Sequence, residues 1–152
     1  MLALAPLQTA WFRVELATVF IAPEELRELR ERDVVLVELP QRFGKGELVL
    51  STGARHAVAL SIEGDRWIAA IGNRVDREEP PDQLAINLAF RVCDPRELPA
   101  PGSTIVLVLT GEPLVLSSRN DIVGYGEAIE IEGERGVRVT SLSRLPKGEG
   151  VA

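Results

Sequence analysis

The feature of the sequence that most constrains the fold is an internal repeat. The segment FRVELATVFIAPEEL (12–26) aligns with LAINLAFRVCDPREL (84–98), which places Pro23 on Pro95. Further along, DVVLVEL (33–39) aligns with STIVLVL (103–109) once the second copy is allowed a slightly shorter helical segment. Self-similarity of this kind indicates one supersecondary module written twice, so the fold must accommodate two copies of the same unit.

A Gly-x-Gly-Glu motif occurs once in each half, as GKGE at 44–47 and as GYGE at 124–127. Superposing the two motifs requires an insertion in the second half, so that a stretch near PLVLSSRNDI has no counterpart in the first. On this alignment the motifs are the same hairpin in two copies. We expect their glycines at tight turns or bulges where φ is positive: Gly44, Gly46, Gly124 and Gly126.

Runs of β-branched and alternating apolar residues dominate both halves, and they predict strands. The only convincing helix is APEELRELRERD (22–33), where Pro23 suits the first helical position and acidic residues follow it. The fold class is therefore mainly β, a β-rich α+β protein with one short helix in its first half. Strands are expected at 11–21, 34–39, 46–51, 55–64, 66–72, 84–92, 104–109, 112–117, 121–133 and 136–145.

The domain organisation follows from the repeat and from one break in composition. Residues 1–72 are expected to form the first domain and residues 84–146 the second. Between them, NRVDREEPPDQ (73–83) is charged and carries two consecutive prolines, which is typical of a linker. Residues 147–152 are expected to be a tail. A module of about 60 residues buries only a modest core, so pairing of the two modules would complete it.

Charge and composition disfavour several classes of partner. The net charge is −6, and neither half is basic: residues 1–76 carry 9 basic and 11 acidic side chains, and residues 77–152 carry 8 and 12. Nucleic acid and anionic membrane surfaces are therefore unexpected partners. The single cysteine fits a reducing compartment, and no apolar run approaches the ~20 residues that span a bilayer. MLALAPLQTAWF lacks the basic region of a signal peptide. We expect a cytoplasmic protein.

The motifs that could carry chemistry are weak. A phosphate-binding loop needs glycines that lead into a helix, whereas Gly44-Lys45-Gly46 leads into a predicted strand. A zinc site is not expected, because the chain has one histidine, His56, and one cysteine, Cys93, far apart in the sequence. We expect no cofactor and no metal.

One enzymatic alternative rests on the two motif glutamates. Glu47 and Glu127 could face each other as general acid and base in a small β-barrel hydrolase. That function would require both carboxylates in one cleft, about 5–10 Å apart. A ligand-binding barrel is a further alternative, and it would need a deep apolar pocket.

The second half carries several motifs at fixed spacing. They are Pro-Gly-Ser at 101–103, Pro113, Gly-x-Gly-Glu at 124–127 and GVRVT at 136–140. In these features it resembles the SpoA (surface presentation of antigens) domain of flagellar motor switch proteins and of the cytoplasmic-ring protein of type III secretion injectisomes, the YscQ/HrcQ type. The first half keeps Gly-x-Gly-Glu at 44–47 without the other motifs, and so resembles a divergent second copy.

The resemblance implies two tandem SpoA-like modules with intertwined strands that pair as an internal pseudo-dimer. It implies no enzymatic activity, but a scaffold of the cytoplasmic ring, or sorting platform, at the inner-membrane base of a type III secretion system. The implied partners are the stator protein that regulates the ATPase and other ring subunits, with homo-oligomers through SpoA pairing. In that family a larger N-terminal region precedes the tandem domains. The alternative within the same class is a flagellar motor switch component.

The resemblance also implies where a partner would bind. In related domains the strand after Gly-x-Gly-Glu presents an exposed apolar patch, and the matching residues here are Ala128, Ile129 and Ile131. Glu130 and Glu132 interrupt this run. We expect a protein-binding surface at these three residues, and no catalytic or cofactor-binding residue.

Overall fold

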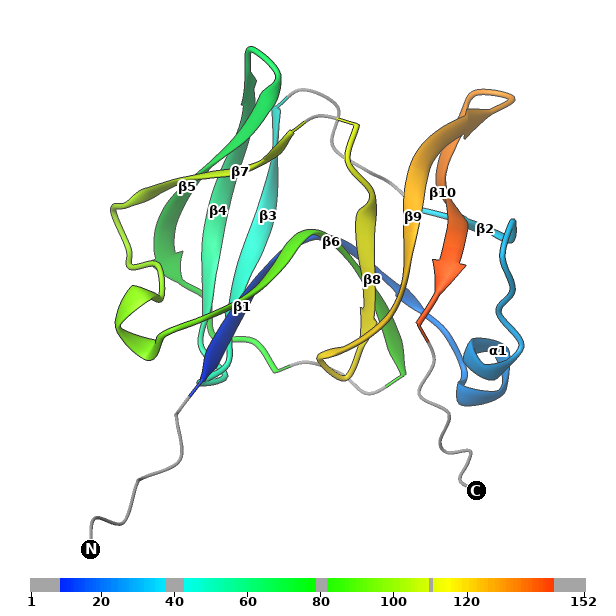
Figure 1. Cartoon of the computed structure of the whole chain (residues 1–152), viewed down its shortest axis with the longest axis horizontal. Coiled ribbons are helices and arrows are strands. Elements are labelled where there is room, and N and C mark those ends of the chain that lie inside the picture. The colour runs from blue at the N-terminus through cyan, green and yellow to red at the C-terminus, as the bar shows by residue number, and fades with distance from the viewer. Residues whose placement is uncertain (1–8, 38–42, 79–81, 110, 144–152) are drawn as a thin grey trace, which may run out of the picture.

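The computed structural model of the chain describes residues 9–37, 43–78, 82–109 and 111–143. Within these ranges the protein is mainly β, with ten strands in one antiparallel sheet, one short α-helix and one 3-10 turn (Figure 1). The sheet order is β2-β10-β9-β8-β6-β1-β3-β4-β5-β7. The predicted mainly-β fold class is confirmed. The described residues contain no helix that is long and apolar enough to cross a membrane.

The strands lie close to where the apolar patterns predict them. The first half forms β1 (Ala10–Phe20), α1 (Pro23–Arg27), β2 (Val34–Leu36), β3 (Phe43–Leu50), β4 (Arg55–Glu63) and β5 (Arg66–Arg74). The second half forms β6 (Gln83–Cys93), η1 (Pro95–Glu97), β7 (Thr104–Leu109), β8 (Leu114–Ser118), β9 (Asp121–Ile131) and β10 (Glu134–Leu142). The predicted tail at 147–152 lies outside the described residues.

Helix α1 is much shorter than the predicted span of 22–33. It begins as expected, with Pro23 in its first turn and the Glu25 carboxylate accepting a hydrogen bond from the Ala22 N–H at 2.9 Å. The chain then leaves the helix because it bonds to β10. The Arg32 N–H donates to the Val139 carbonyl at 2.7 Å, and the Val139 N–H donates to the Asp33 carbonyl at 2.8 Å. Tertiary pairing therefore ends a helix that local propensity would extend.

The strand order reads the same from both ends once the two halves are exchanged. Strands β1 and β6 pair at the centre, each followed outward by three strands of its own half. The outermost strand on each side comes from the other half, because β2 pairs with β10 and β7 pairs with β5. Figure 1 shows β2 beside β10 at one end of the molecule and β7 beside β5 at the other. The two halves thus exchange one strand each.

This order corrects the second part of the sequence alignment. Strand β3 corresponds to β8 and β4 to β9, so that Leu48 corresponds to Leu116, and both are fully buried. The first Gly-x-Gly-Glu lies in β3 and the second lies in β9, which are not counterparts. The motifs are therefore not the same hairpin, and the second half carries no insertion at PLVLSSRNDI. Superposing the motifs was wrong because apolar strands of similar period align in more than one register.

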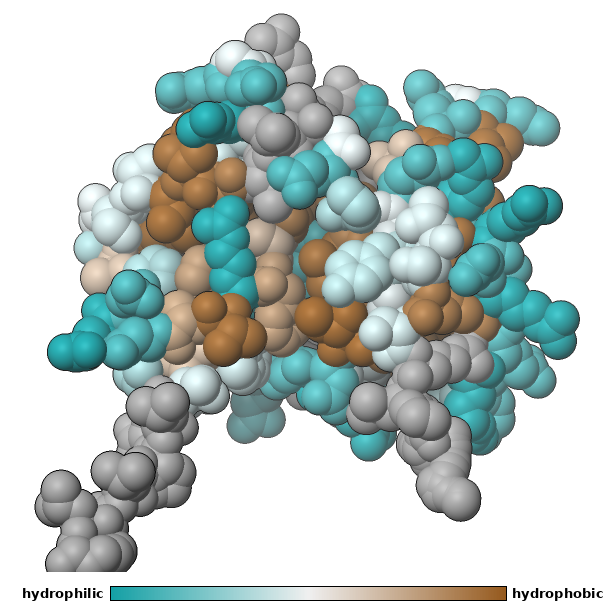
Figure 2. All heavy atoms as spheres, in the orientation of Figure 1, coloured by the Kyte–Doolittle hydropathy of each residue, from teal (hydrophilic) through white to brown (hydrophobic). Residues whose placement is uncertain are grey.

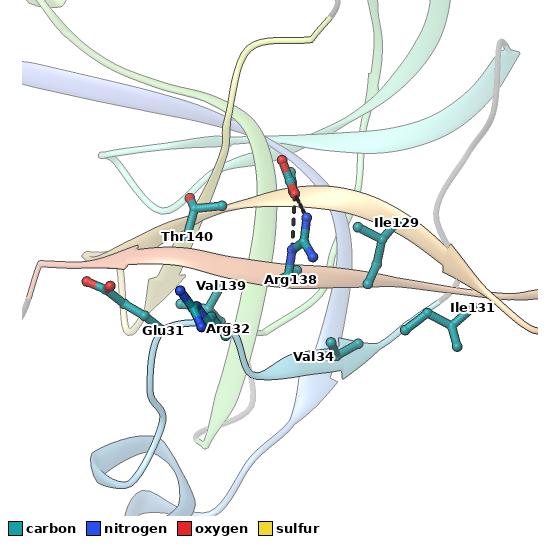
Figure 3. A pocket seen from close by; sticks show the side chains of 9 residues that line it. Glu31, Arg32, Val34, Ile129, Ile131, Arg138, Val139 and Thr140 are labelled. Carbon is teal, nitrogen blue, oxygen red and sulfur yellow. Dashed lines mark hydrogen bonds and ion pairs between the residues drawn. The ribbon is translucent and has the colours of Figure 1, made fainter.

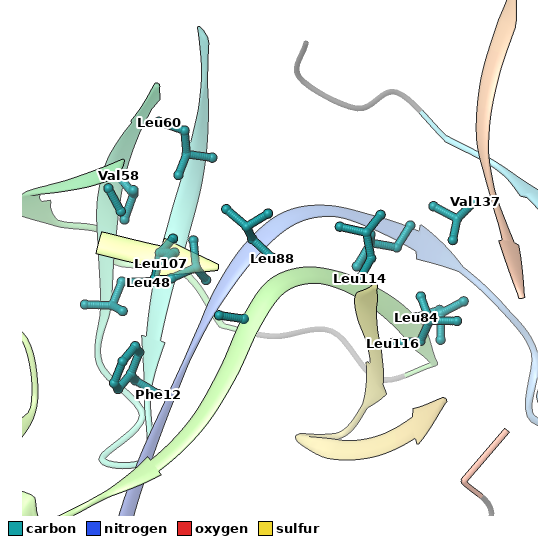
Figure 4. Close-up of a cluster of buried hydrophobic side chains, with 14 of the residues drawn as sticks. Phe12, Leu48, Val58, Leu60, Leu84, Leu88, Leu107, Leu114, Leu116 and Val137 are labelled. Carbon is teal, nitrogen blue, oxygen red and sulfur yellow. The ribbon is translucent and has the colours of Figure 1, made fainter. Parts of the chain in front are cut away.

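The core lies on one face of the curved sheet and draws on both halves (Figure 4). Leucine and valine fill most of it, as the low aromatic content requires, and Phe12 is its aromatic member. Its most buried members alternate along each strand, as expected for one face of a sheet: Val14, Leu48, Leu84, Ile86, Leu116 and Val137.

The described part of the predicted linker is attached to the sheet. The Val75 N–H donates to the Arg55 carbonyl at 2.8 Å, and the Ile21 N–H donates to the Asp82 carbonyl at 2.9 Å. Arg77 adds an ion pair with Glu47 at 2.9 Å. The charged composition that is typical of a linker therefore also supplies contacts that hold this segment against the first half.

Candidate protein-interaction site

An exposed groove of about 720 Å³ runs along β9, β10 and β2 at one end of the sheet. Ile129 and Ile131 of β9 line one side and Val34 of β2 lines the other, with Arg138 and Thr140 of β10 between them. Figure 3 shows Ile129, Ile131 and Val34 gathered at one end of the groove. Ile131 is 47% exposed and Val34 is 39% exposed. The groove thus presents apolar side chains of β9 and of the exchanged edge strand β2.

The strand register sets which residues share this face of the sheet. Ile129 pairs with Gly136 of β10, and Gly136 pairs in turn with Leu36 of β2. Directly paired residues share a face of the sheet, so a residue without a side chain separates two large apolar ones. At the opposite end of the sheet the corresponding pair is Val106 with Ile68, where an isoleucine fills the space. The two ends of the sheet therefore differ at this pair of residues.

Charged groups border the groove. Glu127 and Arg138 form an ion pair across β9 and β10, with a second contact from Arg138 Nε to Glu127 Oε1 at 3.1 Å. Glu31 and Arg32 lie at the other side. Figure 2 shows hydrophilic side chains gathered over the edge of the molecule that carries α1 and β2. The lining carries two acidic and two basic residues, so the groove suits an apolar segment with polar flanks.

The structure divides the predicted patch between two faces. Ile129 and Ile131 lie in the groove, whereas Ala128 pairs with the buried Val137 and so belongs to the opposite face. Side chains alternate along a strand, so the adjacent residues Ala128 and Ile129 cannot line the same surface. Val34, which approaches from the first half, lines the groove in place of Ala128. Sequence reasoning missed it because β2 reaches β9 only through the strand exchange.

The motif glycines lie inside strands and have no positive φ, so their assignment to turns was wrong: Gly44, Gly46, Gly124 and Gly126. Close approach explains three of them instead. A Cβ on Gly46 would lie 2.5 Å from the Glu15 carbonyl oxygen, one on Gly126 would lie 2.5 Å from Val137 Cγ1, and one on Gly124 would meet the Ser141 carbonyl. These positions need glycine because a neighbouring strand leaves no room for a side chain.

The two motif glutamates are not brought into one cleft. Glu47 lies on β3 and Glu127 on β9, with three strands between them in the sheet order. Each carboxylate is also held by arginine, Glu47 by Arg55 at 2.7 Å and Glu127 by Arg138. The geometry that the hydrolase alternative requires is therefore absent for this pair.

Glu47 belongs to a partly buried polar cluster that the sequence did not reveal. Arg13 of β1 contacts Glu15 Oε2 at 2.8 Å and Asn87 Oδ1 of β6 at 2.9 Å. Arg55 contacts Glu47 at 2.7 Å and Glu15 at 3.5 Å. We call the following residues the axial cluster, because they surround the central pair of strands: Arg13, Glu15, Glu47, Arg55, Arg77, Asn87, Ser117 and Asn120.

The axial cluster occupies the face of β1 and β6 that alternation assigns to solvent. Arg13 and Asn87 are nevertheless fully buried, and Glu15 is nearly so. The Asn87 amide donates to Ser117 Oγ at 2.9 Å and to the Val115 carbonyl at 3.0 Å. Polar residues inside the apolar runs WFRVEL and LAINL were the only signal in the sequence, and alternation alone reads them as solvent-facing.

No metal-binding group was found among the residues that the structure describes. His56 lies within β4, and its buried Nδ1 has no hydrogen-bond partner in the described part of the chain. Cys93 ends β6, where burial raises the pKa of its thiol, with smaller contributions from Glu97 and Asp94. Hydrogen bonds from Arg96 lower the pKa of Asp94, which caps η1.

Comparison with known proteins does not assign the chain to a group. No family pattern matches the sequence, and no curated protein is significantly similar to it.

Proposed function

We propose that the chain is a non-enzymatic scaffold built from two tandem SpoA-like modules, and that it acts in the cytoplasmic ring, or sorting platform, of a type III secretion system. The observation that carries this proposal is the exchange of β2 and β7 between the halves. The SpoA resemblance implies intertwined strands that join two modules as an internal pseudo-dimer. A strand order that reads alike from both ends, with one exchanged strand on each side, is the form expected of such a pair.

The groove supports a binding role for this scaffold. Contiguous exposed apolar side chains on an edge of a sheet are typical of surfaces that receive another protein. Ile129 and Ile131 lie in the groove and belong to the strand that the resemblance singles out. The proposed partners are the stator protein that regulates the secretion ATPase and other ring subunits, at the inner-membrane base of the apparatus.

The test is capture of partners by the tagged chain from lysate of its source cells, with bound proteins identified by mass spectrometry. Ile129→Asp and Ile131→Asp place a charge in the groove. Val106→Asp is the matched control, because Val106 is 46% exposed and Ile131 is 47% exposed, and Val106 lies on the far edge strand β7. We expect the parent and the control to retain the secretion stator, and both groove variants to lose at least tenfold of it while keeping their circular dichroism.

The outcomes separate the alternatives. Recovery of flagellar rotor proteins in place of secretion proteins would assign the chain to a motor switch. Retention of the stator by both groove variants would move the binding site away from the groove. If the parent captures neither secretion nor flagellar components, the SpoA resemblance describes architecture alone and the proposed function is wrong.

A further inference from the structure

The centre of the axial cluster lies where the two halves meet. Glu15 of β1 pairs directly with Asn87 of β6, and these two residues are counterparts in the repeat. Register shifts flank this pair on both sides. Arg13 and Ala85 are counterparts in the same alignment. Because counterparts face each other at Glu15 and Asn87, the approximate twofold relation between the halves passes through this pair.

The two halves contribute different chemistry to the cluster. The first half supplies charges: the Arg13 guanidinium and the Glu15 carboxylate lie 2.8 Å apart. The second half supplies neutral acceptors: Asn87 Oδ1 accepts from Arg13 Nη1 at 2.9 Å, and Asn120 Oδ1 accepts from Arg13 Nε at 3.2 Å. Arg13 and Asn87 are both fully buried, so water cannot readily replace the Asn87 acceptor. The guanidinium therefore takes acceptors from both halves.

We propose that the axial cluster selects pairing of the first half with the second, and rejects pairing of the first half with the first half of another copy of the chain. In such a homotypic pair, Glu15 would face Glu15 across the axis, and paired residues have Cβ atoms only about 4.5–5.5 Å apart. Two buried like charges at that distance oppose each other. The directly paired Glu15 and Glu47 of the first half are offset by Arg55 and Arg77, each of which contacts both carboxylates. Arg13 would also lose the Asn87 acceptor. Its other amide acceptor, Asn120, would be replaced by Thr52, which is the counterpart of Asn120 in the first half.

Stability alone does not explain such a cluster. Replacing buried ion pairs with apolar residues of similar volume is often neutral or stabilising, whereas a single buried polar residue can specify register and partner. The apolar pattern of the strands does not by itself distinguish the halves, because β3 aligns in sequence with either β8 or β9. A buried contact that needs one first half and one second half would favour that pair over a pair of two first halves. This inference does not depend on the proposed function.

The test removes the tether between the halves after the full chain has folded. A cleavage sequence for a specific protease is inserted between Glu78 and Asp82, since a covalent linker favours internal pairing whatever the interface contains. The folded protein is cleaved, unfolded in urea and refolded, and the paired fragments are weighed by native mass spectrometry. For the parent we expect pairs of first and second halves, and at least tenfold fewer pairs of two first halves.

The decisive variant is Arg13→Ala/Glu15→Asn, which gives the first half the residues that the second half carries at the same places. We expect pairs of two first halves to rise at least tenfold over the parent. Glu47→Gln is the matched control. It removes a carboxylate from the same cluster, but Glu47 pairs with Glu15 of its own half rather than across the axis. We expect its pairing to resemble that of the parent.

Three results would overturn the proposal. The first is random pairing of the parent fragments, with first-half pairs at their statistical share. The second is an unchanged pairing pattern in Arg13→Ala/Glu15→Asn. The third is an equal rise of first-half pairs in Glu47→Gln, which would indicate general loosening. If the double variant fails to refold by circular dichroism, Glu15→Asn alone replaces it, with the same expected rise and the same refuting result.

Discussion

Substitution of Gly46 by alanine tests whether the motif glycines serve close strand approach. Gly46 lies in β3 with no positive φ, so alanine can adopt its backbone conformation. The new Cβ would lie 2.5 Å from the Glu15 carbonyl oxygen and 3.2 Å from Leu60 Cδ1. Carbon–oxygen contacts normally begin at about 3.3 Å, so the strands must separate by roughly 0.8 Å. The obstacle is backbone, which cannot rotate aside as a side chain could.

The expected cost follows from this displacement. Glu15 is fixed by its pairing with Asn87 and by the ion pair with Arg13, so movement of its carbonyl disturbs the axial cluster. Overpacking of this kind costs about 1–3 kcal/mol. Replacing glycine also lowers the conformational entropy of the unfolded chain, which stabilises the folded state by about 0.4–1 kcal/mol. We therefore expect Gly46→Ala to lower the free energy of unfolding by about 1–2 kcal/mol.

The measurement is urea denaturation followed by circular dichroism and tryptophan fluorescence, with comparison of midpoints at unchanged m value. Gly72→Ala is the control, because Gly72 also lies in a strand and has no positive φ. A Cβ added there would lie 3.3 Å from the Ala57 carbonyl oxygen, its nearest neighbour. We expect a change within about 0.5 kcal/mol there. If Gly46→Ala is no less stable than Gly72→Ala, close approach is not the reason for glycine at this position.

Two further predictions concern the core and the cysteine. Leu48→Ala and Leu116→Ala, at corresponding fully buried positions, should each lower the free energy of unfolding by about 2–5 kcal/mol in urea titrations, and a loss below about 1 kcal/mol in either would contradict its place in the core. The pKa of Cys93 is raised, so the folded state holds the thiol proton more tightly than the unfolded chain does. The stability gained from the protonated thiol is therefore complete below pH 9.0 and declines as pH rises through the folded pKa. Iodoacetamide alkylation of the folded protein should therefore have its pH midpoint above 9.0, and a midpoint below that of the urea-unfolded chain would refute this.

The elements could be predicted because they depend on local pattern. Each expected strand appears, since alternation of apolar residues records which side of a strand is buried. The correspondence of α1 with η1 also follows from local signals, Pro23 and Pro95. The alignment failed at Gly-x-Gly-Glu because the apolar pattern of one strand resembles that of its neighbour. Only the order of the hydrogen-bonded strands shows that β3 corresponds to β8 in the repeat and not to β9.

The candidate site likewise has residues that local sequence could indicate and residues that only the pairing of distant strands brings in. Ile129 and Ile131 could be named from the sequence because the SpoA resemblance points to the strand after Gly-x-Gly-Glu, and they lie at alternate positions on that strand. Val34 could not, because it joins them only when β2 pairs with β10, a strand from the far end of the sequence. The buried state of Arg13 was equally hidden. Local patterns assign a charged residue to solvent, and its burial depends on acceptors that distant segments supply.

The sequence by itself determined that this chain is mainly β, that its two halves repeat one order of elements, and where each strand begins and ends to within a few residues. These properties follow from interactions between residues close together in the chain. Only the tertiary structure decided that β2 and β7 change sides, that Val34 joins Ile129 and Ile131 in one groove, and that the charged side chains of Arg13 and Glu15 are buried. Each of these depends on pairing between distant strands, whose many similar alternatives are separated by packing and hydrogen bonding across the whole sheet.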